Sequence, residues 1–224
     1  MFLLDVAHEV LGNDLAVGIA RTPYMFEHEC REAETEAHRR GLKYFSPLLC
    51  WGEGPEGIWR NSRDRCYLCK RFLLRQLQEW RGHLGMDWLM DGTQSDDQPS
   101  QRPGFRALRE LSVRSPLLES GMTKDDIRRL ARSRGLMCWN KPSNSCLLTR
   151  LPDNAPVTEE ALRRVAQAEE ILLASGLSQV RARVCGDMLR VETLPQDFEI
   201  LAEQAAHLEP QLKELGFVCV TFNN

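Results

Sequence analysis

The sequence predicts an α/β protein with a parallel sheet, followed by a second, smaller α+β domain. Helical and strand patterns alternate through residues 1–140, which is typical of a parallel sheet covered by helices on both faces. After residue 150 the order changes to helix, two strands, helix and strand. We therefore expect two domains, at residues 1–150 and 151–224.

The elements follow from apolar spacing and from the residues that end them. Apolar residues at helical spacing predict helices, at residues 2–11, 27–40, 65–83, 123–135, 159–175 and 195–215. Short apolar runs predict strands, at residues 15–20, 43–49, 87–90, 179–184, 188–193 and 217–222. Thr123 with Asp126 three residues later forms a capping-box pattern. Cys185-Gly186-Asp187 separates two strand patterns and predicts a hairpin.

Composition restricts the class of protein. The 224 residues are 42% hydrophobic and 27% charged, with a net charge of −3, as in an ordinary globular protein. A nucleic-acid binder usually has a basic surplus, so this acidic balance argues against RNA or DNA as a partner.

No apolar run approaches the roughly 20 residues that span a bilayer, and residues 1–5 lack the pattern of a signal peptide. We expect a cytoplasmic protein.

Eight cysteines stand out in such a chain. In a reducing compartment they are more typical of buried residues, metal ligands or nucleophiles than of disulfides. They are Cys30, Cys50, Cys66, Cys69, Cys138, Cys146, Cys185 and Cys219.

Cys66 and Cys69 form a C-x-x-C at the start of a predicted helix. A helix N-terminus lowers the pKa of a thiol, and this spacing lets two sulfurs reach one metal ion or cluster. A zinc site would need two more ligands at similar spacing, and Cys138 with Cys146 is not a second C-x-x-C. The alternative is a pair of half-buried helix cysteines.

Cys146 lies in a polar loop between Lys141 and Arg150. These cations would favour a thiolate at Cys146, and loops carry functional residues disproportionately. Three cysteines around one point suit an iron–sulfur cluster with one open iron. The alternative is a polar loop with an incidental thiol.

Two further patterns suit anions or nucleotides. Arg181 and Arg183 alternate on a predicted strand and therefore share a face, where two guanidinium groups suit a phosphate or carboxylate; Glu192 on the paired strand could neutralise them or bind a divalent ion. The face could also simply be solvated.

The acidic segment 91–97 follows a predicted strand. In α/β proteins nucleotides or Mg²⁺ bind at such a position, although a plain polar turn is the alternative.

An ordered set of motifs resembles one known family over residues 2–222. The motifs are Arg65-Cys66-Tyr67-Leu68-Cys69-Lys70, Asp91-Gly92-Thr93-Gln94-Ser95-Asp96-Asp97, Arg102-Pro103-Gly104, Val113-Arg114-Ser115-Pro116-Leu117, Lys141-Pro142-Ser143 through Cys146-Leu147 to Arg150, and Val180-Arg181-Ala182-Arg183 through Gly186-Asp187. In this order they resemble the LarE family, the ATP-dependent sacrificial sulfur transferases of the PP-loop superfamily.

The resemblance implies a fold and a reaction. The fold would be a Rossmann-like domain of the adenine nucleotide alpha hydrolase type, followed by the small α+β domain. The substrate would be a pyridinium dicarboxylate mononucleotide, one carboxylate of which is adenylated with ATP and Mg²⁺. Sulfur would then displace AMP to give a thiocarboxylate for a nickel-pincer cofactor. A homo-oligomer is also expected.

The resemblance assigns residues to roles. Members with one cysteine give up the sulfur at the position of Cys146, whereas members with the added C-x-x-C hold a [4Fe-4S] cluster on three cysteines. This chain has all three, so Cys66, Cys69 and Cys146 are predicted cluster ligands. The other predicted roles are nucleotide binding by Asp91, Gly92, Thr93, Asp96 and Arg114, substrate-phosphate binding by Arg181 and Arg183, and metal binding by Glu169 and Glu192.

The chain departs from the family at its beginning. The PP-loop signature S-G-G-x-D-S, which precedes the position of Phe2 in the family, does not occur in the sequence. We therefore expect that the chain as written lacks the first strand and the PP-loop and cannot adenylate its substrate. Two alternatives stay open: a tRNA-thiolating enzyme of the same superfamily, and a degenerate, non-catalytic member.

Overall fold

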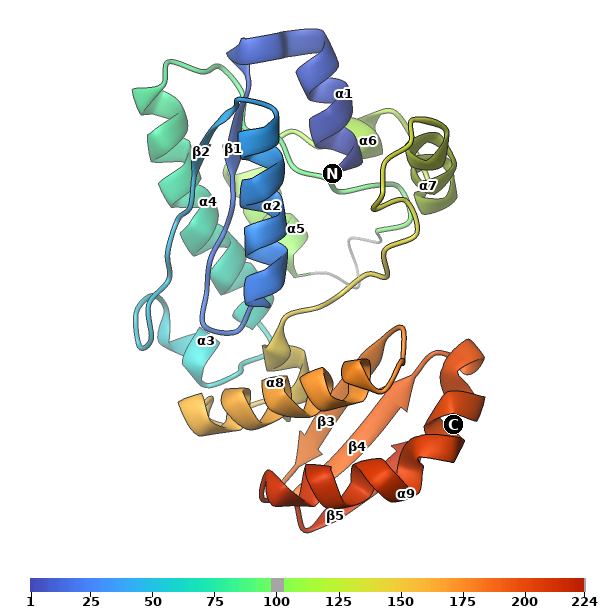
Figure 1. Cartoon of the computed structure of the whole chain (residues 1–224). Helices are drawn as coiled ribbons and strands as arrows, with labels where there is room; N and C mark the ends of the chain where they lie inside the picture. The colour runs from blue at the N-terminus through green and yellow to red at the C-terminus, as the bar shows by residue number, and fades with distance from the viewer. Residues whose placement is uncertain (98–102, 224) are drawn as a thin grey trace. The chain divides into compact units, whose positions relative to one another are not determined.

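The computed structural model describes residues 1–97 and 103–223, and the chain divides into two compact units (Figure 1). The first unit holds residues 1–58 and 64–141, and the second holds 59–63 and 142–224. The predicted boundary at residue 150 therefore differs from this division. Residues 142–150 group with the second unit because their polar groups bond to α8 (Glu159–Ala174) and β3 (Val180–Cys185).

A parallel strand pair forms the centre of the first unit. β1 (Ala16–Gly18) pairs with β2 (Lys43–Phe45), and Arg21 and Leu48 add an isolated bridge beyond them. Successive side chains of a strand point to opposite faces. Tyr44 contacts His38 of α2 (Glu27–Arg39), whereas Phe45 contacts Trp80 of α4 (Arg65–His83). The two helices therefore cover opposite faces of the pair.

The remaining elements of the first unit are short, except for its first and last helices. They are α1 (Phe2–Leu11), the 3₁₀ turn η1 (Gly12–Asp14), α3 (Glu56–Trp59), α5 (Gly104–Glu110), α6 (Pro116–Glu119) and α7 (Lys124–Ser133). The predicted capping box is confirmed, since Thr123 and Asp126 exchange hydrogen bonds at the start of α7. The predicted strand at 87–90 is reduced to one parallel bridge, between Met90 and Arg114.

The second unit is a three-stranded sheet with two helices. The predicted hairpin is confirmed: β3 pairs antiparallel with β4 (Met188–Thr193). β5 (Cys219–Asn223) then pairs parallel with β4. The 3₁₀ turns η3 (Leu147–Arg150) and η4 (Pro195–Asp197) and the helices α8 and α9 (Phe198–Glu214) complete the unit.

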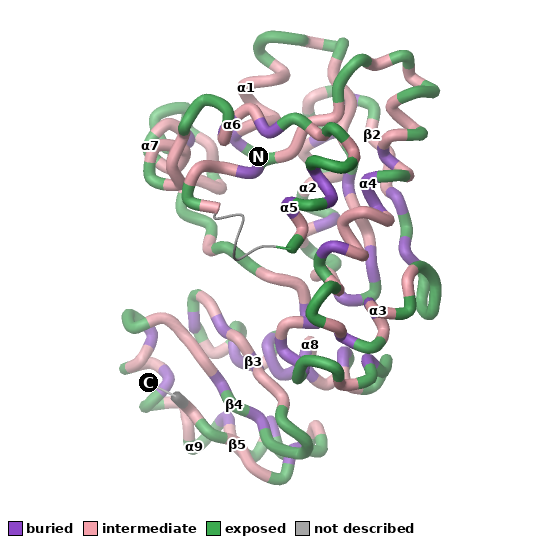
Figure 2. Tube along the Cα trace, turned by 180° about the vertical axis from the view of Figure 1, so that it is seen from behind, coloured by how far each residue is buried: buried purple, intermediate pink, exposed green. Residues whose placement is uncertain are grey.

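Alternation along these strands produces one apolar and one polar face. Ala182, Leu189 and Val191 are fully buried, on the face that α8 and α9 cover (Figures 1 and 2). Arg181, Arg183 and their cross-strand partners lie on the opposite face, which is more exposed. The sheet thus presents a row of charged side chains.

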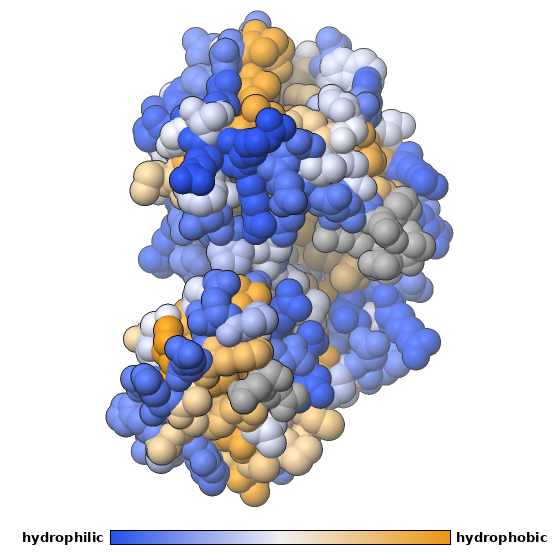
Figure 3. Space-filling model, turned by 90° about the vertical axis from the view of Figure 1, so that its right-hand side faces the viewer, coloured by the Kyte–Doolittle hydropathy of each residue, from blue (hydrophilic) through white to orange (hydrophobic). Residues whose placement is uncertain are grey.

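The whole chain is of the predicted α/β class, with one small parallel sheet and a second, mixed sheet. The face drawn in Figure 3 is mainly hydrophilic, with smaller hydrophobic areas between the charged side chains. Among the helices that the structure describes, none is both long and apolar enough to cross a membrane.

A charge cluster joins α1 to α2, and it predicts acid sensitivity. Hydrogen bonds from Arg39 and Arg40 hold the pKa of Glu36 at about 2, below its usual 4.5, and Arg40 also pairs with Asp5 at 2.8 Å. Because this carboxylate has a depressed pKa, its stabilisation is complete above about pH 4.5 and is lost as the pH falls towards 2.

We therefore expect Glu36→Gln to lower the free energy of unfolding at neutral pH by about 1 kcal/mol or less, since solvent screens such pairs. The difference from the wild type should vanish near pH 2. Thermal unfolding of both proteins across this pH range measures it. A difference independent of pH would contradict the role of the Glu36 charge.

Candidate functional site

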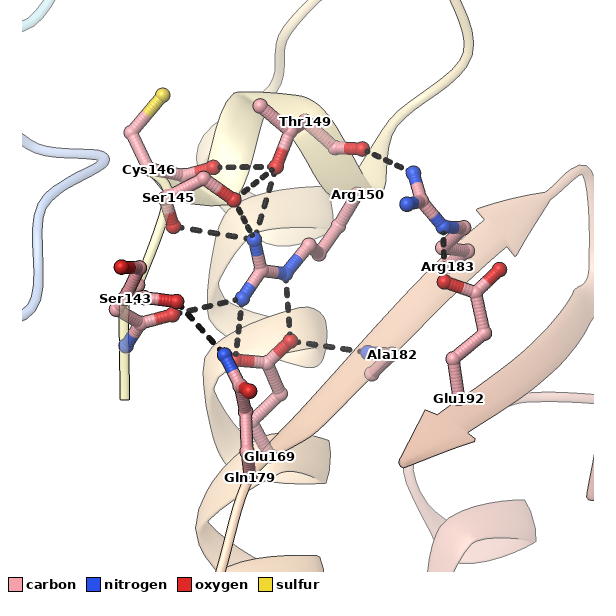
Figure 4. Close-up of polar contacts among 11 residues, drawn as sticks. Ser143, Ser145, Cys146, Thr149, Arg150, Glu169, Gln179, Ala182, Arg183 and Glu192 are labelled. Carbon is pink, nitrogen blue, oxygen red and sulfur yellow. Dashed lines mark hydrogen bonds and ion pairs between the residues drawn. The ribbon is translucent and has the colours of Figure 1, made fainter. Parts of the chain in front are cut away.

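The predicted nucleophile, Cys146, lies directly before η3 and is half-buried. Its carbonyl oxygen accepts hydrogen bonds from the Thr149 backbone N–H at 3.1 Å and from the Thr149 hydroxyl at 2.9 Å. Figure 4 shows the sulfur directed away from these polar contacts. The turn therefore fixes the backbone that carries the half-buried thiol.

A fully buried arginine organises this turn. Arg150 donates to both carboxylate oxygens of Glu169, at 2.7 and 3.2 Å (Figure 4), and the side chains of this pair are 0% and 2% exposed. Arg150 also donates to four oxygen atoms of three loop residues. They are the Asn144 side-chain oxygen (3.1 Å), the Ser145 carbonyl and hydroxyl (3.0 and 2.6 Å) and the Thr149 hydroxyl (2.8 Å). The guanidinium is thus saturated with oxygen acceptors.

Two amide side chains hold the same segment from other parts of the second unit. The Asn61 amide donates to the carbonyls of Leu148, Leu151 and Pro152, at 3.2, 3.2 and 2.8 Å. The Gln179 amide donates to the carbonyl of Ser143 at 2.7 Å. The segment around Cys146, residues 143–152, is called the thiol loop below. It is consequently held by hydrogen bonds at both of its ends.

The two predicted phosphate-binding arginines lie on the polar face of the sheet. Arg183 donates to Glu192 at 2.6 Å and to the Thr149 carbonyl at 3.1 Å, so this strand is bonded to the thiol loop. Arg181 is half-buried and opposes Glu192 across the strands. Within residues 1–97 and 103–223, Arg181 forms no ion pair, and its charge is available to an anion.

Glu192 lies between two arginines. Arg190 pairs with its second oxygen at 3.0 Å. Burial alone would raise the pKa of Glu192, but the hydrogen bond and charge of Arg183, with the help of Arg190, lower it below the ordinary value. Glu192 is therefore a carboxylate at neutral pH and reduces the positive charge around Arg183.

The C-x-x-C lies at the start of α4, as predicted. Cys66 is exposed and Cys69 is half-buried. The hydroxyl of Tyr24, a residue only 1% exposed, donates a hydrogen bond to the Cys69 sulfur at 3.0 Å. A donor at this position stabilises the thiolate form of Cys69, which is the form that binds metals.

Asp91 is the centre of a second polar network, in the first unit. Its carboxylate accepts from Lys70 at 3.0 Å and from the hydroxyls of Thr93 and Ser115, both at 2.7 Å. Burial raises the pKa of Asp91, but the Lys70 charge and these hydroxyl donors outweigh it and lower the pKa. Asp91 is thereby fixed as a charged anchor for the loop that follows it.

The other residues predicted to bind the nucleotide lie around this loop. Gly92 is exposed and Thr93 is buried against Asp91. Asp96 accepts a hydrogen bond from the Lys124 backbone N–H at 2.7 Å, at the start of α7. Arg114 lies over the Trp88 ring, 5.1 Å from its centroid, and pairs with Glu119.

The predicted metal and cluster ligands come from both units. Cys66 and Cys69 belong to the first unit and Cys146 to the second. Within the described ranges, no three His, Cys, Asp or Glu side chains are grouped so that they could hold a metal ion. Glu169, a predicted metal ligand, is occupied by Arg150 and by the Ala182 backbone N–H at 2.9 Å. These ligand assignments stay predictions.

Sequence reasoning missed several residues that shape these networks. Their roles depend on contacts between distant segments. Tyr24 and Asn61 lie outside the quoted motifs, whereas Lys70 and Ser115 stand in those motifs but were given no role. The sequence did single out Arg150, but as a cation favouring a Cys146 thiolate; the structure shows it in a buried ion pair.

The fold and these networks define an α/β protein with a thiol-bearing loop beside an arginine-rich sheet face. No known family profile matches the chain. It is 32% identical over 221 residues to an uncharacterized protein of Synechocystis sp., covering 97% of this chain and 82% of that protein. It is 29% identical over 226 residues to the pyridinium-3,5-bisthiocarboxylic acid mononucleotide synthase of Lactiplantibacillus plantarum, covering 99% and 80%.

An uncharacterized protein of Methanocaldococcus jannaschii is 27% identical over 221 residues, covering 99% of this chain and 84% of that protein. These similarities extend over nearly the whole chain, as the ordered motifs do. The chain belongs to the family of these proteins, the LarE family.

The Tyr24 contact predicts how Cys69 reacts. Tyr24→Phe removes the hydrogen bond to the sulfur, which favours the thiolate, so Cys69 should be alkylated more slowly. If the hydrogen bond stabilises the thiolate by about 1 kcal/mol, its removal makes alkylation roughly fivefold slower at a pH below the thiol pKa. Site-resolved mass spectrometry after timed iodoacetamide treatment measures this rate, with the exposed Cys185 as the internal control. Equal slowing at both cysteines would point to a general effect instead.

Proposed function

We propose that this protein is an ATP-dependent sulfurtransferase that converts a carboxylate of a pyridinium dicarboxylate mononucleotide into a thiocarboxylate for nickel-pincer cofactor biosynthesis. Support comes from the synthase of Lactiplantibacillus plantarum, to which 99% of the chain aligns. The observation that carries the proposal is the bond between Arg183 and the thiol loop. It joins the loop that carries the proposed nucleophile to the strand that carries the proposed phosphate-binding arginines, within one unit.

The reaction has two steps. The substrate carboxylate attacks the α-phosphorus of ATP, pyrophosphate leaves, and an acyl-adenylate forms. A sulfur nucleophile then attacks the acyl carbon, and the bond to AMP breaks with its electron pair leaving on AMP. Adenylation is required because a carboxylate is a poor electrophile, and a thiolate is the natural nucleophile for the second step.

The second unit would hold the phosphate of the substrate. Arg181 offers a guanidinium that forms no ion pair with the residues that the structure describes, and Arg183 is fixed by Glu192 and by the Thr149 carbonyl. Paired guanidinium groups recognise phosphate with charge-assisted hydrogen bonds. Of the two predicted metal ligands, Glu192 is the more accessible, because its side chain is 31% exposed and that of Glu169 is 2% exposed.

The first unit would bind ATP with Mg²⁺, as a Rossmann-like domain of the PP-loop type. Helices α2 and α4 cover opposite faces of the parallel pair, which is the layering of such domains. The loop after Asp91 would contact adenosine, because ligands of open α/β sheets gather beyond the carboxyl ends of strands. The Lys70, Thr93 and Ser115 contacts keep this loop in one shape.

The C-x-x-C fits two ligands of an iron–sulfur cluster. Cys66 and Cys69 are three residues apart in a helix and so share a face, and the Tyr24 donor favours a thiolate at Cys69. With Cys146 as the third ligand, a [4Fe-4S] cluster would supply a sulfide for the transfer. The alternative source is the Cys146 sulfur itself, given up by the chain.

The test is formation of thiocarboxylate from the mononucleotide, ATP and Mg²⁺ under anaerobic conditions. Product and pyrophosphate in equal amounts would support the proposal and would contradict the expectation from the sequence that the chain cannot adenylate its substrate. Cys146→Ser should give no product. The mass of the chain after turnover identifies the sulfur source: it falls by that of hydrogen sulfide if Cys146 is sacrificed, and stays constant if a cluster supplies sulfide. Pyrophosphate release that depends on tRNA instead would favour the tRNA-thiolating alternative.

Arg181→Ala tests the phosphate site. A charge-assisted hydrogen bond contributes about 1.5–3 kcal/mol, so substrate binding should weaken roughly ten- to a hundredfold. ATP binding should not change. Isothermal titration measures both affinities, and Arg163→Ala, at an exposed arginine of α8, is the matched control. Equal affinities in the wild type and Arg181→Ala would remove Arg181 from the site.

A further inference from the structure

We propose that Arg150 is the positioning residue for Cys146 and that Glu169 aligns the thiol loop with the arginine-bearing strand. The positioning is a property of the folded chain. Its importance for sulfur transfer rests on the proposed function.

Stability alone does not account for a buried ion pair at this place. Removing a guanidinium and a carboxylate from water costs several kcal/mol per ion, and apolar residues of similar volume often stabilise as well or better. Leucine or methionine could therefore fill the space between η3 and α8. Neither could donate to Asn144, Ser145 and Thr149, as Arg150 does.

The residues that accept hydrogen bonds from Arg150 flank Cys146 along the chain. Asn144 and Ser145 precede it and Thr149 follows it, and the Thr149 hydroxyl in turn donates to the Cys146 carbonyl at 2.9 Å. Ser145 and Thr149 are also within 3.0 Å of each other through their hydroxyl oxygens. One guanidinium thus bonds to groups on both sides of the thiol (Figure 4).

Glu169 extends this control to the sheet. The carboxylate oxygen that accepts from the Arg150 Nε also accepts from the Ala182 backbone N–H at 2.9 Å. Ala182 lies between Arg181 and Arg183 on β3. A single carboxylate therefore bonds both the residue that shapes the thiol loop and the strand that carries the phosphate-binding arginines. The pair sets the spacing between sulfur and substrate phosphate.

The first experiment measures the thiol without any turnover. The double variant Arg150→Met with Glu169→Leu removes both buried charges together, so that neither is left unpaired. We expect its loop to loosen and Cys146 to be alkylated about tenfold faster, because a half-buried thiol gains access when its backbone is released. The exposed Cys185 should keep its rate. Lys213→Met with Glu209→Leu, an exposed pair of the same unit, is the control.

Two further variants keep the test decisive if the double variant does not fold. Ser145→Ala with Thr149→Val leaves the ion pair intact and removes hydroxyl acceptors, and should raise the Cys146 rate by roughly threefold. Arg150→Lys keeps the charge but loses the planar fork, and should act in the same direction. Unchanged Cys146 alkylation in every variant that folds would overturn the proposal.

Sulfur transfer provides the second readout. In the folded variants we expect kcat to fall by about ten- to a hundredfold, since small misplacements of reacting groups have effects of this size. Substrate affinity should change less than about twofold, because Arg181 and Arg183 remain. If the wild type transfers no sulfur, the proposed function fails while the alkylation result still stands. If kcat is retained despite faster alkylation, Arg150 does not position the reacting sulfur.

Discussion

The second unit depends on the buried ion pair between Arg150 and Glu169. Each charge is almost completely removed from water, which is tolerated only where every polar atom finds a partner. The pair meets this condition by recruiting groups from the thiol loop and from β3. The loop, α8 and β3 are therefore joined by polar contacts in addition to the apolar core.

Asp91 has a comparable place in the first unit, but the balance of forces differs. Its carboxylate is held by one cation, Lys70, and by the hydroxyls of Thr93 and Ser115. These groups come from α4, from the loop itself and from the start of α6. The lowered pKa of Asp91 shows that they outweigh its desolvation. In both units, therefore, a partly or fully buried charged side chain with hydrogen-bond partners holds a loop in one conformation.

Local patterns predicted the elements well where the signal was strong. The capping box of Thr123 and Asp126, the hairpin around Gly186 and the helix start at the C-x-x-C were all confirmed, because each depends on contacts within a few residues. The strand at 87–90 was less successful. A short apolar segment forms a strand only if its neighbours supply partners, and in the structure only Met90 pairs, with Arg114.

The sequence by itself determined the family, the α/β class and the chemical inventory: three candidate cysteines, two arginines on one strand face, and an acidic loop after Asp91. These features are local or depend on the alternation of side chains along a strand. Only the tertiary structure decided which side chains bond to one another. It placed Glu169 against Arg150, Tyr24 beside Cys69, and Asn61 under the turn after Cys146. Partner choice is set by which distant segments pack together and by the requirement that buried polar groups be satisfied, and no local pattern encodes either.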